Sequence, residues 1–360
     1  MDQIRQAWRE GLGPGLVRQH ANESPWDVPA ELKADIIQML AELPFSRYDW
    51  ALRPLLLAAL ARYTGMPADC IVPGTGADEL IQLSMISLVG PGGRVVTTSP
   101  TFFVYPHTAA ALGREVQDVP LRRPGYELDV AGLRRAVRPG DLVFICRPNN
   151  PTGNVFAAAD VLQVLDDCEA RGATVVLDEA YYEFCGQTLV DEIISGRRER
   201  VLALRTMSKA FRLAGLRLGY ALLARPLVEP FERARLTYNI SAASMVAALG
   251  VLSQPALAAR TAKTTAELRS RFSERLAGLP GVTVHPSETN FIFVELPCAA
   301  EPVQRALAEQ GLLLRYFAGS EQLAQALRIS IGDDDDNEKI VAALDQALRR
   351  FADCPGGPPQ

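Results

Sequence analysis

The chain has 360 residues, of which 48% are hydrophobic and 22% charged. At roughly 100–200 residues per domain, this length predicts two or three domains with enough core to need no disulfide or metal. Lys and Arg total 37 against 42 Asp and Glu, a net charge of -5. This balance argues against nucleic acid as the main partner, because phosphate backbones bind basic faces.

Cysteine and hydropathy patterns predict a cytosolic protein. The six cysteines are scattered and include no C-x-x-C pair, so we expect reduced thiols. Three isolated histidines make a metal site unlikely to form, and we expect none. The first residues lack the apolar core of a signal peptide, and no apolar run reaches the ~18 residues of a membrane helix. We therefore expect no membrane contact.

The N-terminal and central parts predict a helix-flanked sheet. Several prolines in the first 45 residues indicate an extended arm with a helix at 30–43, and an amphipathic helix follows at 53–65. Strands then alternate with helices, which is typical of a mostly parallel sheet covered on both faces. The expected strands are 94–99, 115–121, 141–146, 174–180, 200–206 and 219–224. The expected helices between them are 77–89, 108–113, 158–172 and 189–196.

The pattern changes after Tyr238 and predicts a second, smaller α+β domain. Helices are expected over 241–279, near 302–311 and at 337–351, and strand-like runs over 282–296 and 326–332. We therefore predict an N-terminal arm with part of the small domain at 1–45, a large domain at 46–265, the small domain at 266–352 and a disordered tail at 353–360. The acidic run 333–336 could bind a cation, but a helix start is favoured, because the helix dipole attracts acidic side chains there.

Four sites along the chain carry chemistry, each with a simpler alternative. Lys209 follows a strand, where apolar neighbours can make an amine nucleophilic, although most lysines are solvated surface charges. Asp178 ends another strand, where it could face a ligand or cap a helix. The loop RPNNPTGN at 147–154 offers two amides or forms an ordinary turn. PGTGADELIQL at 73–83 leads two glycines into a helix, an arrangement suited to phosphate, but the third glycine of a dinucleotide fingerprint is missing.

The order of these sites resembles that of the fold type I pyridoxal-phosphate enzymes, and within them the class I/II aminotransferases. The resemblance extends over nearly the whole chain, and within this family it is most specific for the histidinol-phosphate aminotransferase group. It implies a three-layer α/β/α large domain with a mostly parallel sheet, plus a smaller α+β domain. The segments that carry it are NESPWDVP, SRYDW, GTGADE, PTFFVY, PNNPTG, DEAYYEF, TMSKAFRLAGLRLGY, YNIS, PSETNF, LRYF and LRISIG.

The resemblance implies a pyridoxal 5′-phosphate site with specific roles. Lys209 would hold the cofactor covalently and later move the proton between Cα of the substrate and C4′ of the cofactor. Asp178 would pair with the pyridine nitrogen and keep it protonated. Tyr181 and Asn150 would hydrogen-bond the phenolic oxygen, and Tyr105 would stack on the ring.

The resemblance also implies how the phosphate is held and how the chain assembles. The phosphate would be bound by five residues, through backbone N–H groups of the first two and side chains of the others: Ala77, Asp78, Thr206, Ser208 and Arg217. Arginine suits this role because its planar fork can bind two oxygens at once. Tyr48 would reach the phosphate region of a neighbouring subunit, which implies a homodimer.

The implied reaction transfers an amino group from L-histidinol phosphate to 2-oxoglutarate and gives imidazole acetol phosphate and glutamate. Arg328 and Arg315 would bind the anionic groups of these substrates, although Arg315 could instead be a strand residue whose stem lies on apolar surface. Asn22 and Glu23 in the arm would cover the site. An aromatic amino-acid aminotransferase or a threonine-phosphate decarboxylase remains open on the same fold.

Three departures from the family pattern bear on these expectations. Asp49-Trp50 replaces a Pro-Asp pair after Tyr48, Arg212 stands where glycine is common, and the acidic run at 333–336 replaces a Thr-containing stretch. Two other classes of protein fit the sequence less well. A ligand-sensing regulator is disfavoured by the lack of room for a DNA-binding segment before residue 20, and a nicotinamide dehydrogenase by the missing glycine.

Overall fold

The computed structural model describes residues 1–351 except 2, 5, 7–14 and 49. The tail at 353–360, predicted to be disordered, and Asp49 therefore lie outside the described residues. The chain divides into two compact units, and both chain ends contribute to the smaller one. The larger unit is Trp26–Lys263, and the smaller unit is Met1–Pro25 with Thr264–Gln360.

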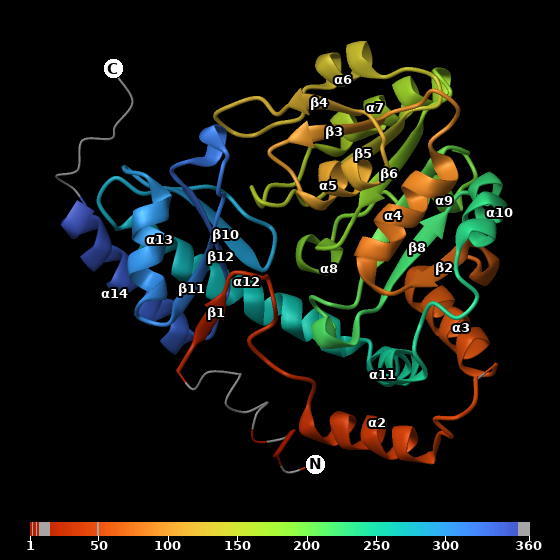
Figure 1. Ribbon diagram of the computed structural model, residues 1–360, viewed down its shortest axis with the longest axis horizontal. Coiled ribbons are helices and arrows are strands. Elements are labelled where there is room, and N and C mark those ends of the chain that lie inside the picture. Colours follow the sequence, from red (N-terminus) through yellow and green to blue (C-terminus); the bar gives the residue numbers. More distant parts are fainter. Residues whose placement is uncertain (2, 5, 7–14, 49, 352–360) are drawn as a thin grey trace. The chain divides into compact units, whose positions relative to one another are not determined.

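The larger unit is built on a sheet of seven strands in the described chain (Figure 1). Its order is β2 (Ile71–Gly74), β8 (Gly219–Leu223), β7 (Val201–Thr206), β6 (Thr174–Asp178), β5 (Leu142–Cys146), β3 (Val95–Ser99) and β4 (Val116–Pro120). The four strands from β8 to β5 are buried at every residue. Strands covered on both faces read as continuous apolar runs, which explains why they were visible in the sequence.

Helices cover both faces of this sheet and complete an α/β fold (Figure 1). α4 packs on β7 and β8, α5 on β3, and α7 on β6, while α10 packs on α4. The helices are α2 (Ala30–Glu42), α3 (Leu52–Thr64), α4 (Gly76–Leu88), α5 (Val104–Ala111), α6 (Val130–Ala136), α7 (Ala158–Ala170), α8 (Tyr182–Cys185), α9 (Asp191–Ile194), α10 (Arg225–Ala234) and α11 (Ala242–Leu252). Long α12 (Ala256–Ala277) runs from the larger unit into the smaller one.

The smaller unit is an α+β fold around five described strands. Their order is β1 (Val17–Gln19), β11 (Leu312–Tyr316), β12 (Ala326–Ser330), β10 (Phe291–Glu295) and β9 (Thr283–Val284). β1 pairs in parallel with β11, and the other pairs are antiparallel. α13 (Ala300–Ala308) packs on β11 and on α14 (Asp334–Phe351).

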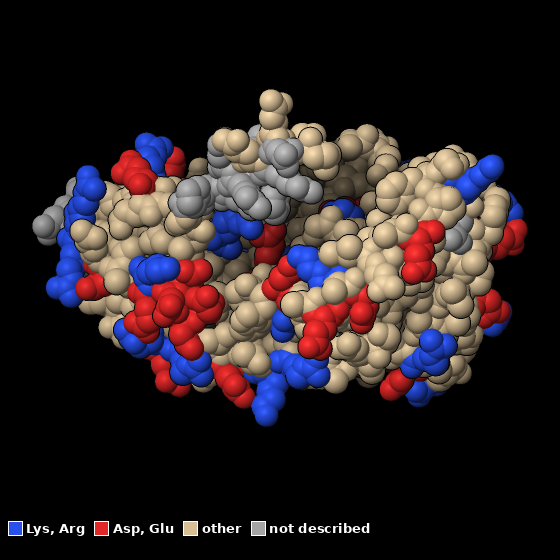
Figure 2. All heavy atoms as spheres, turned by 90° about the horizontal axis from the view of Figure 1, so that it is seen from below, with Lys and Arg blue, Asp and Glu red and all other residues tan. Residues whose placement is uncertain are grey.

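The acidic run lies at the start of α14, as the helix interpretation expected. Asp333 accepts a hydrogen bond from the Asp336 N–H at 2.9 Å, and Asp334 pairs with Arg271 at 2.8 Å. Lys339 pairs with Asp336 from the next turn. Acidic and basic side chains are interspersed on the face of the molecule that Figure 2 shows.

Three features of the sheets differ from the expectations. β8 runs antiparallel to both of its neighbours, β2 and β7. β2 was not expected as a strand, and in the smaller unit β1 and β11 were not expected either.

Among the described residues, no single helix has both the length and the apolar composition of a bilayer span; α11 and α12 meet that test only as a pair bent by 77°.

Candidate active site

The candidate site lies where parallel strands of the larger unit end. β5, β6 and β7 run parallel, and their last residues are Cys146, Asp178 and Thr206. Carboxyl ends of parallel strands meet at one edge of a sheet, where open α/β folds bind ligands. The loop RPNNPTGN, the DEAY segment and the turn at Lys209 therefore begin at this same edge.

Asp178 is a buried carboxylate held in a defined orientation. Its side chain is almost completely inaccessible, and one oxygen accepts a hydrogen bond from the Tyr105 hydroxyl at 2.5 Å. The other oxygen accepts from the Ala180 N–H at 3.0 Å, while the N-cap position of α8 is taken by Tyr181 rather than by Asp178. Burial raises the pKa of Asp178 to about 6, and the Tyr105 hydrogen bond opposes this rise. An adjacent positive charge would stabilise the ionised form of this carboxyl group.

Tyr105 lies at the centre of an aromatic cluster. Its ring is fully buried, stacks on Phe144 with centroids 4.7 Å apart and meets Phe102 edge-on at 5.6 Å. Burial raises the pKa of its hydroxyl well above the usual value, so Tyr105 acts as a neutral donor to Asp178. Stacking of Tyr105 on a cofactor ring stays a prediction.

A second pair of polar side chains comes from the loop after β5 and the segment after β6. The Asn150 side-chain amide donates to the Tyr181 hydroxyl at 3.4 Å, and both residues are buried. Asn149 holds the loop itself: its amide binds the Pro100 carbonyl and the Thr152 hydroxyl. The loop is thus both a tight turn and a rigid support for Asn150.

Arg217, Ser208 and the start of α4 lie together in a polar cradle, and phosphate binding there stays a prediction. Arg217 donates to Asp78 at 3.1 Å and to the Ser208 hydroxyl at 3.4 Å. A Cβ at Gly76, whose φ is +76°, would lie 2.7 Å from the Arg217 guanidinium. Thr75 makes no side-chain cap hydrogen bond to α4 in the described chain, and helix starts of this kind can bind anions through their first N–H groups.

Thr206 and Ser208 order the other side of the cradle. The Thr206 hydroxyl accepts from the Ser208 N–H at 3.1 Å and donates to the Leu218 carbonyl. Lys209 follows directly and is half-buried. Its carbonyl accepts from the Arg212 N–H at 3.0 Å, which closes a turn that begins at Lys209.

A buried ion pair, absent from the sequence-based hypothesis, supports this edge of the sheet. Arg205 binds the Glu179 carboxylate at 2.8 Å, and both side chains are almost fully buried. Thr188 donates its hydroxyl to the same carboxylate at 2.9 Å, and the Arg205 guanidinium lies 3.7 Å from the Tyr182 ring centre. Glu179 adjoins Asp178, so the pair fixes the turn that carries Asp178 and Tyr181. Nothing in the sequence pairs these two residues; only their shared sheet edge does.

Asn239 is a second residue that sequence reasoning missed. Its amide donates to the Pro73 carbonyl at 3.2 Å and to the Glu79 carboxylate at 3.1 Å, and its own carbonyl accepts from the Thr75 hydroxyl. Asn239 therefore anchors the chain before α11 to the start of α4. In the sequence, the signal that could have pointed to Asn239 was its position in YNIS, one of the segments that carry the family resemblance.

The smaller unit brings together Arg315 and Arg328, the two arginines predicted to bind substrate. Arg315 on β11 and Arg328 on β12 are directly opposed in the antiparallel register. Like charges directly opposite each other destabilise a sheet unless an anion or other partner compensates them. Arg328 donates to the His20 carbonyl at 2.6 Å. Burial lowers the pKa of His20, and Arg18, Arg328 and Arg315 act in the same direction while Glu23 opposes them.

Asn22 belongs to the same cluster of the smaller unit. It is buried, has a positive φ of 53° and binds the Ser330 hydroxyl through its backbone N–H at 2.8 Å. Asn290 donates to its carbonyl at 2.9 Å. The N-terminal segment is thereby fixed beside β12, and Glu23 follows it half-buried.

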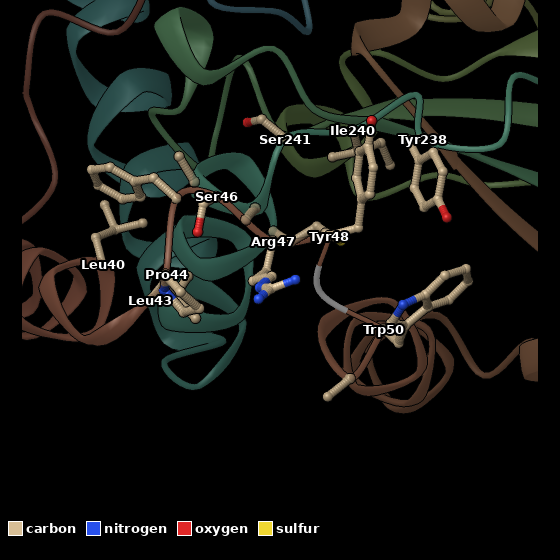
Figure 3. A pocket seen from close by; sticks show the side chains of 15 residues that line it. Leu40, Leu43, Pro44, Ser46, Arg47, Tyr48, Trp50, Tyr238, Ile240 and Ser241 are labelled. Carbon is tan, nitrogen blue, oxygen red and sulfur yellow. The ribbon is translucent and has the colours of Figure 1, made fainter.

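Tyr48 lies elsewhere on the larger unit, in an aromatic group at the edge of a cavity. Its ring stacks on Tyr238 with centroids 4.0 Å apart, and Trp50 meets Tyr238 edge-on at 5.5 Å. The cavity has a volume of about 950 Å³, and Figure 3 shows these side chains with Leu40, Leu43 and Arg47 around it. Tyr238 precedes Asn239, so this group is one residue away from the anchor of α4.

The donor set of the larger unit fits pyridoxal 5′-phosphate. A phosphate needs the α4 N–H groups with Ser208 and Arg217, a pyridine nitrogen needs a buried carboxylate such as Asp178, and a phenolic oxygen needs donors such as Tyr181 and Asn150. A Cβ at Gly76 would meet the Arg217 guanidinium, so only glycine there leaves Arg217 in place beside Asp78 and Ser208.

Comparisons with known proteins identify the family. The sequence model of the family "Aminotransferase class I and II" matches residues 18–344. The histidinol-phosphate aminotransferase of Thermoanaerobacter sp. (strain X514) is 35% identical over 338 residues, which cover 93% of this chain and 94% of that protein.

Solved structures share the architecture. The histidinol-phosphate aminotransferase of Sinorhizobium meliloti in complex with pyridoxal-5'-phosphate has a TM-score of 0.84 and 26% identity, covering 96% of this chain and 95% of its own. The L-threonine-O-3-phosphate decarboxylase of Porphyromonas gingivalis has a TM-score of 0.80 at 22% identity, covering 93% of this chain and 100% of its own. The second likeness concerns the fold alone.

Proposed function

The chain belongs to the class I and II aminotransferases, and on that basis we propose that it transfers the amino group of L-histidinol phosphate to 2-oxoglutarate. The products would be imidazole acetol phosphate and glutamate, a step of histidine biosynthesis. The names of relatives that match along nearly the whole chain support this substrate. The opposed pair Arg315 and Arg328 is the observation that supports this substrate class, because two guanidinium groups favour anions and both proposed substrates are anionic.

The cofactor is pyridoxal 5′-phosphate, which when bound supplies an electron sink for the bonds at the substrate Cα. Arg217, Ser208 and the first N–H groups of α4 would bind its phosphate. Asp178 would hold a proton on the ring nitrogen, since a buried carboxylate stabilises an adjacent cation. Asn150 and Tyr181 would orient the ring through its phenolic oxygen.

Lys209 would act as the base and acid of the reaction. Its Nζ would carry the proton from the substrate Cα to C4′ of the cofactor, and in the second half of the exchange from C4′ to Cα of the product amino acid. The buried pair Glu179–Arg205 would keep the turn at Asp178 and Tyr181 in place while these protons move. Arg315 and Arg328 would bind the phosphate of one substrate and a carboxylate of the other in turn.

We expect the enzyme to be a homodimer that works in the cytosol. Phe45, Tyr48 and Trp50 are 91%, 68% and 73% exposed, and clustered exposed aromatic side chains are typical of protein interfaces. The cavity beside them offers a concave surface for a neighbouring subunit. The cytosolic assignment rests on the free thiols of Cys70, Cys146, Cys168, Cys185 and Cys298.

The test is an assay of the purified protein with pyridoxal 5′-phosphate and L-histidinol phosphate. We expect glutamate to form only when 2-oxoglutarate is added, and phenylalanine, tyrosine and threonine phosphate to react at least ~10-fold more slowly, because they lack one or other of the groups recognised. Lys209→Ala should abolish turnover.

The arginine pair gives a second arm of this test. Arg328→Gln should raise the KM of both substrates by ~10-fold or more, because it removes a charged hydrogen bond of about 1.5–3 kcal/mol. Arg305→Gln is the matched control, since Arg305 forms an exposed pair with Glu301 on α13. Carbon dioxide release from threonine phosphate without any keto acid, or fastest turnover with tyrosine, would contradict the proposal.

A further inference from the structure

Arg212 has an unusual backbone for a residue with a long side chain. Its φ is +63°, in the left-handed region that glycine adopts without strain. Its N–H donates to the Lys209 carbonyl at 3.0 Å, so Arg212 closes the turn in which Lys209 is the first residue. Only one other described arginine, Arg217 in the phosphate cradle, has a positive φ. The side chain must therefore offset the cost of this conformation.

The Arg212 side chain binds two segments that are far apart in the sequence. Its Nη1 donates to the Asp27 carbonyl at 2.9 Å, and its Nε donates to the Thr261 hydroxyl at 3.0 Å. The guanidinium also lies over the Trp26 ring, 5.3 Å from its centre. Thr261 is only 1% exposed, and its hydroxyl donates in turn to the Leu257 carbonyl, so its lone pair faces the arginine.

These two segments are the places where the chain leaves the larger unit. The division falls between Pro25 and Trp26 at one crossing and between Lys263 and Thr264 at the other. The residues that Arg212 binds, Asp27 and Thr261, lie within three residues of these crossings, and both belong to the larger unit. A planar guanidinium with donors on different edges can hold two such acceptors at once, which an ammonium group does less well.

We propose that Arg212 is a positioning residue that fastens both chain crossings to the turn beginning at Lys209. The placement of the Lys209 amine then depends on these two segments, and a shift of either one is passed to the turn through one side chain. The inference rests on the proposed function only for the role of Lys209. The fastening itself is a property of the fold.

The experiment compares three holoenzyme variants by hydrogen exchange and by kinetics. Arg212→Gly keeps the positive φ and removes the side chain, Arg212→Lys keeps the charge and removes the fork, and Thr261→Val removes one acceptor. Arg225→Lys is the control, because Arg225 forms an exposed pair with Asp69 in the same unit. Thermal unfolding of each variant shows that it is folded.

Arg212→Gly and Arg212→Lys should raise amide exchange at 26–28 and 258–263 by ~10-fold and lower kcat by ~5-fold or more, with KM for both substrates changed less than twofold. The pH at which the absorbance of the bound cofactor changes should also shift, which a purely structural role would not cause. The double variant Arg212→Lys/Thr261→Val should equal Arg212→Lys, because both changes remove the same contact.

Unchanged exchange in both segments would overturn the fastening. Raised exchange with unchanged kcat and an unchanged cofactor titration would overturn its link to Lys209. If the unaltered protein has no aminotransferase activity, the proposed function fails, yet the exchange data and the titration of the bound cofactor still decide whether Arg212 holds the two segments and the lysine turn.

Discussion

One carboxyl group, that of Asp178, shows how burial prepares a site for a cation. Burial raises its pKa from 3.8 to about 6, although the Tyr105 hydroxyl donates to it. In the cofactor-free protein, the folded state therefore keeps this proton to a higher pH than the unfolded chain does. A positively charged ring nitrogen would reverse that shift, because an opposite charge favours the ionised carboxylate.

The sign of this shift predicts the pH dependence of stability without cofactor. The free energy of unfolding should fall as pH rises from about 4 to about 6, by about 3 kcal/mol from Asp178 at about 1.4 kcal/mol per pKa unit. Asp178→Asn should remove this part of the fall. Urea unfolding at pH 4 to 7 measures it, and the comparison separates it from Glu183, whose pKa burial raises to about 7. Parallel curves for the two proteins would contradict the assignment.

Many site residues could be predicted because their chemistry is concentrated in short segments. Asp178 with Tyr181, and Ser208 with Lys209, come from single motifs, and the fold places Tyr181 beside Asn150 and Ser208 beside Arg217. Glu179–Arg205 and Asn239 could not be found in this way. Their partners are supplied by a neighbouring strand or by a helix some 160 residues away, and only the tertiary structure brings such residues together.

At the scale of elements, the contact between β8 and α4 positions the residues that we propose to bind the cofactor phosphate. A Cβ built at Gly219 would lie 2.9 Å from the Ala77 nitrogen, the Arg205 carbonyl oxygen and the Gly76 carbonyl carbon. All three atoms are backbone, so no side chain can move aside. Gly219 therefore lets the start of α4 approach the sheet closely. Arg217 can then hydrogen-bond both Asp78 on α4 and Ser208 after β7.

Gly219→Ala should push the start of α4 away from β8 and weaken cofactor binding. We expect the dissociation constant of pyridoxal 5′-phosphate to rise by ~10-fold or more, which corresponds to about 1.4 kcal/mol. Titration of the cofactor-free protein by absorbance measures it. Gly215→Ala is the control, because a Cβ at Gly215 meets open space. Equal affinities in the two variants would show that this close approach is unimportant.

The elements that the sequence did not reveal have physical reasons in common. β2 is four residues long and contains Pro73 and Gly74, and β1 has only three residues, so neither displays a strand period. The direction of β8 could not be read either. Its five buried residues look like a parallel strand, because burial on both faces erases the alternation that usually marks an antiparallel one. Which unit holds α2 is likewise a matter of contacts rather than of local pattern.

At the scale of the whole molecule, the exposed aromatic residues predict self-association. Light scattering should give twice the mass of one chain for the unaltered protein. Trp50→Glu should weaken the dimer by ~30-fold or more, since burying a tryptophan at an interface often contributes at least about 2 kcal/mol. Ile194→Glu on α9 is the control, being exposed but distant in sequence from the cavity residues. A single-chain mass for the unaltered protein would refute the dimer.

The parallel pairing of β1 with β11 has a consequence for synthesis on the ribosome. Val17 emerges early, yet its partner Leu312 is translated about 300 residues later. At about 5–20 residues per second, the N-terminal segment waits for about 15–60 s without its neighbour. The larger unit, being continuous in sequence, can fold during that delay. The smaller one can close only after release of nearly the entire nascent polypeptide, so slowing translation late in the message should prolong the interval in which chaperones can engage it.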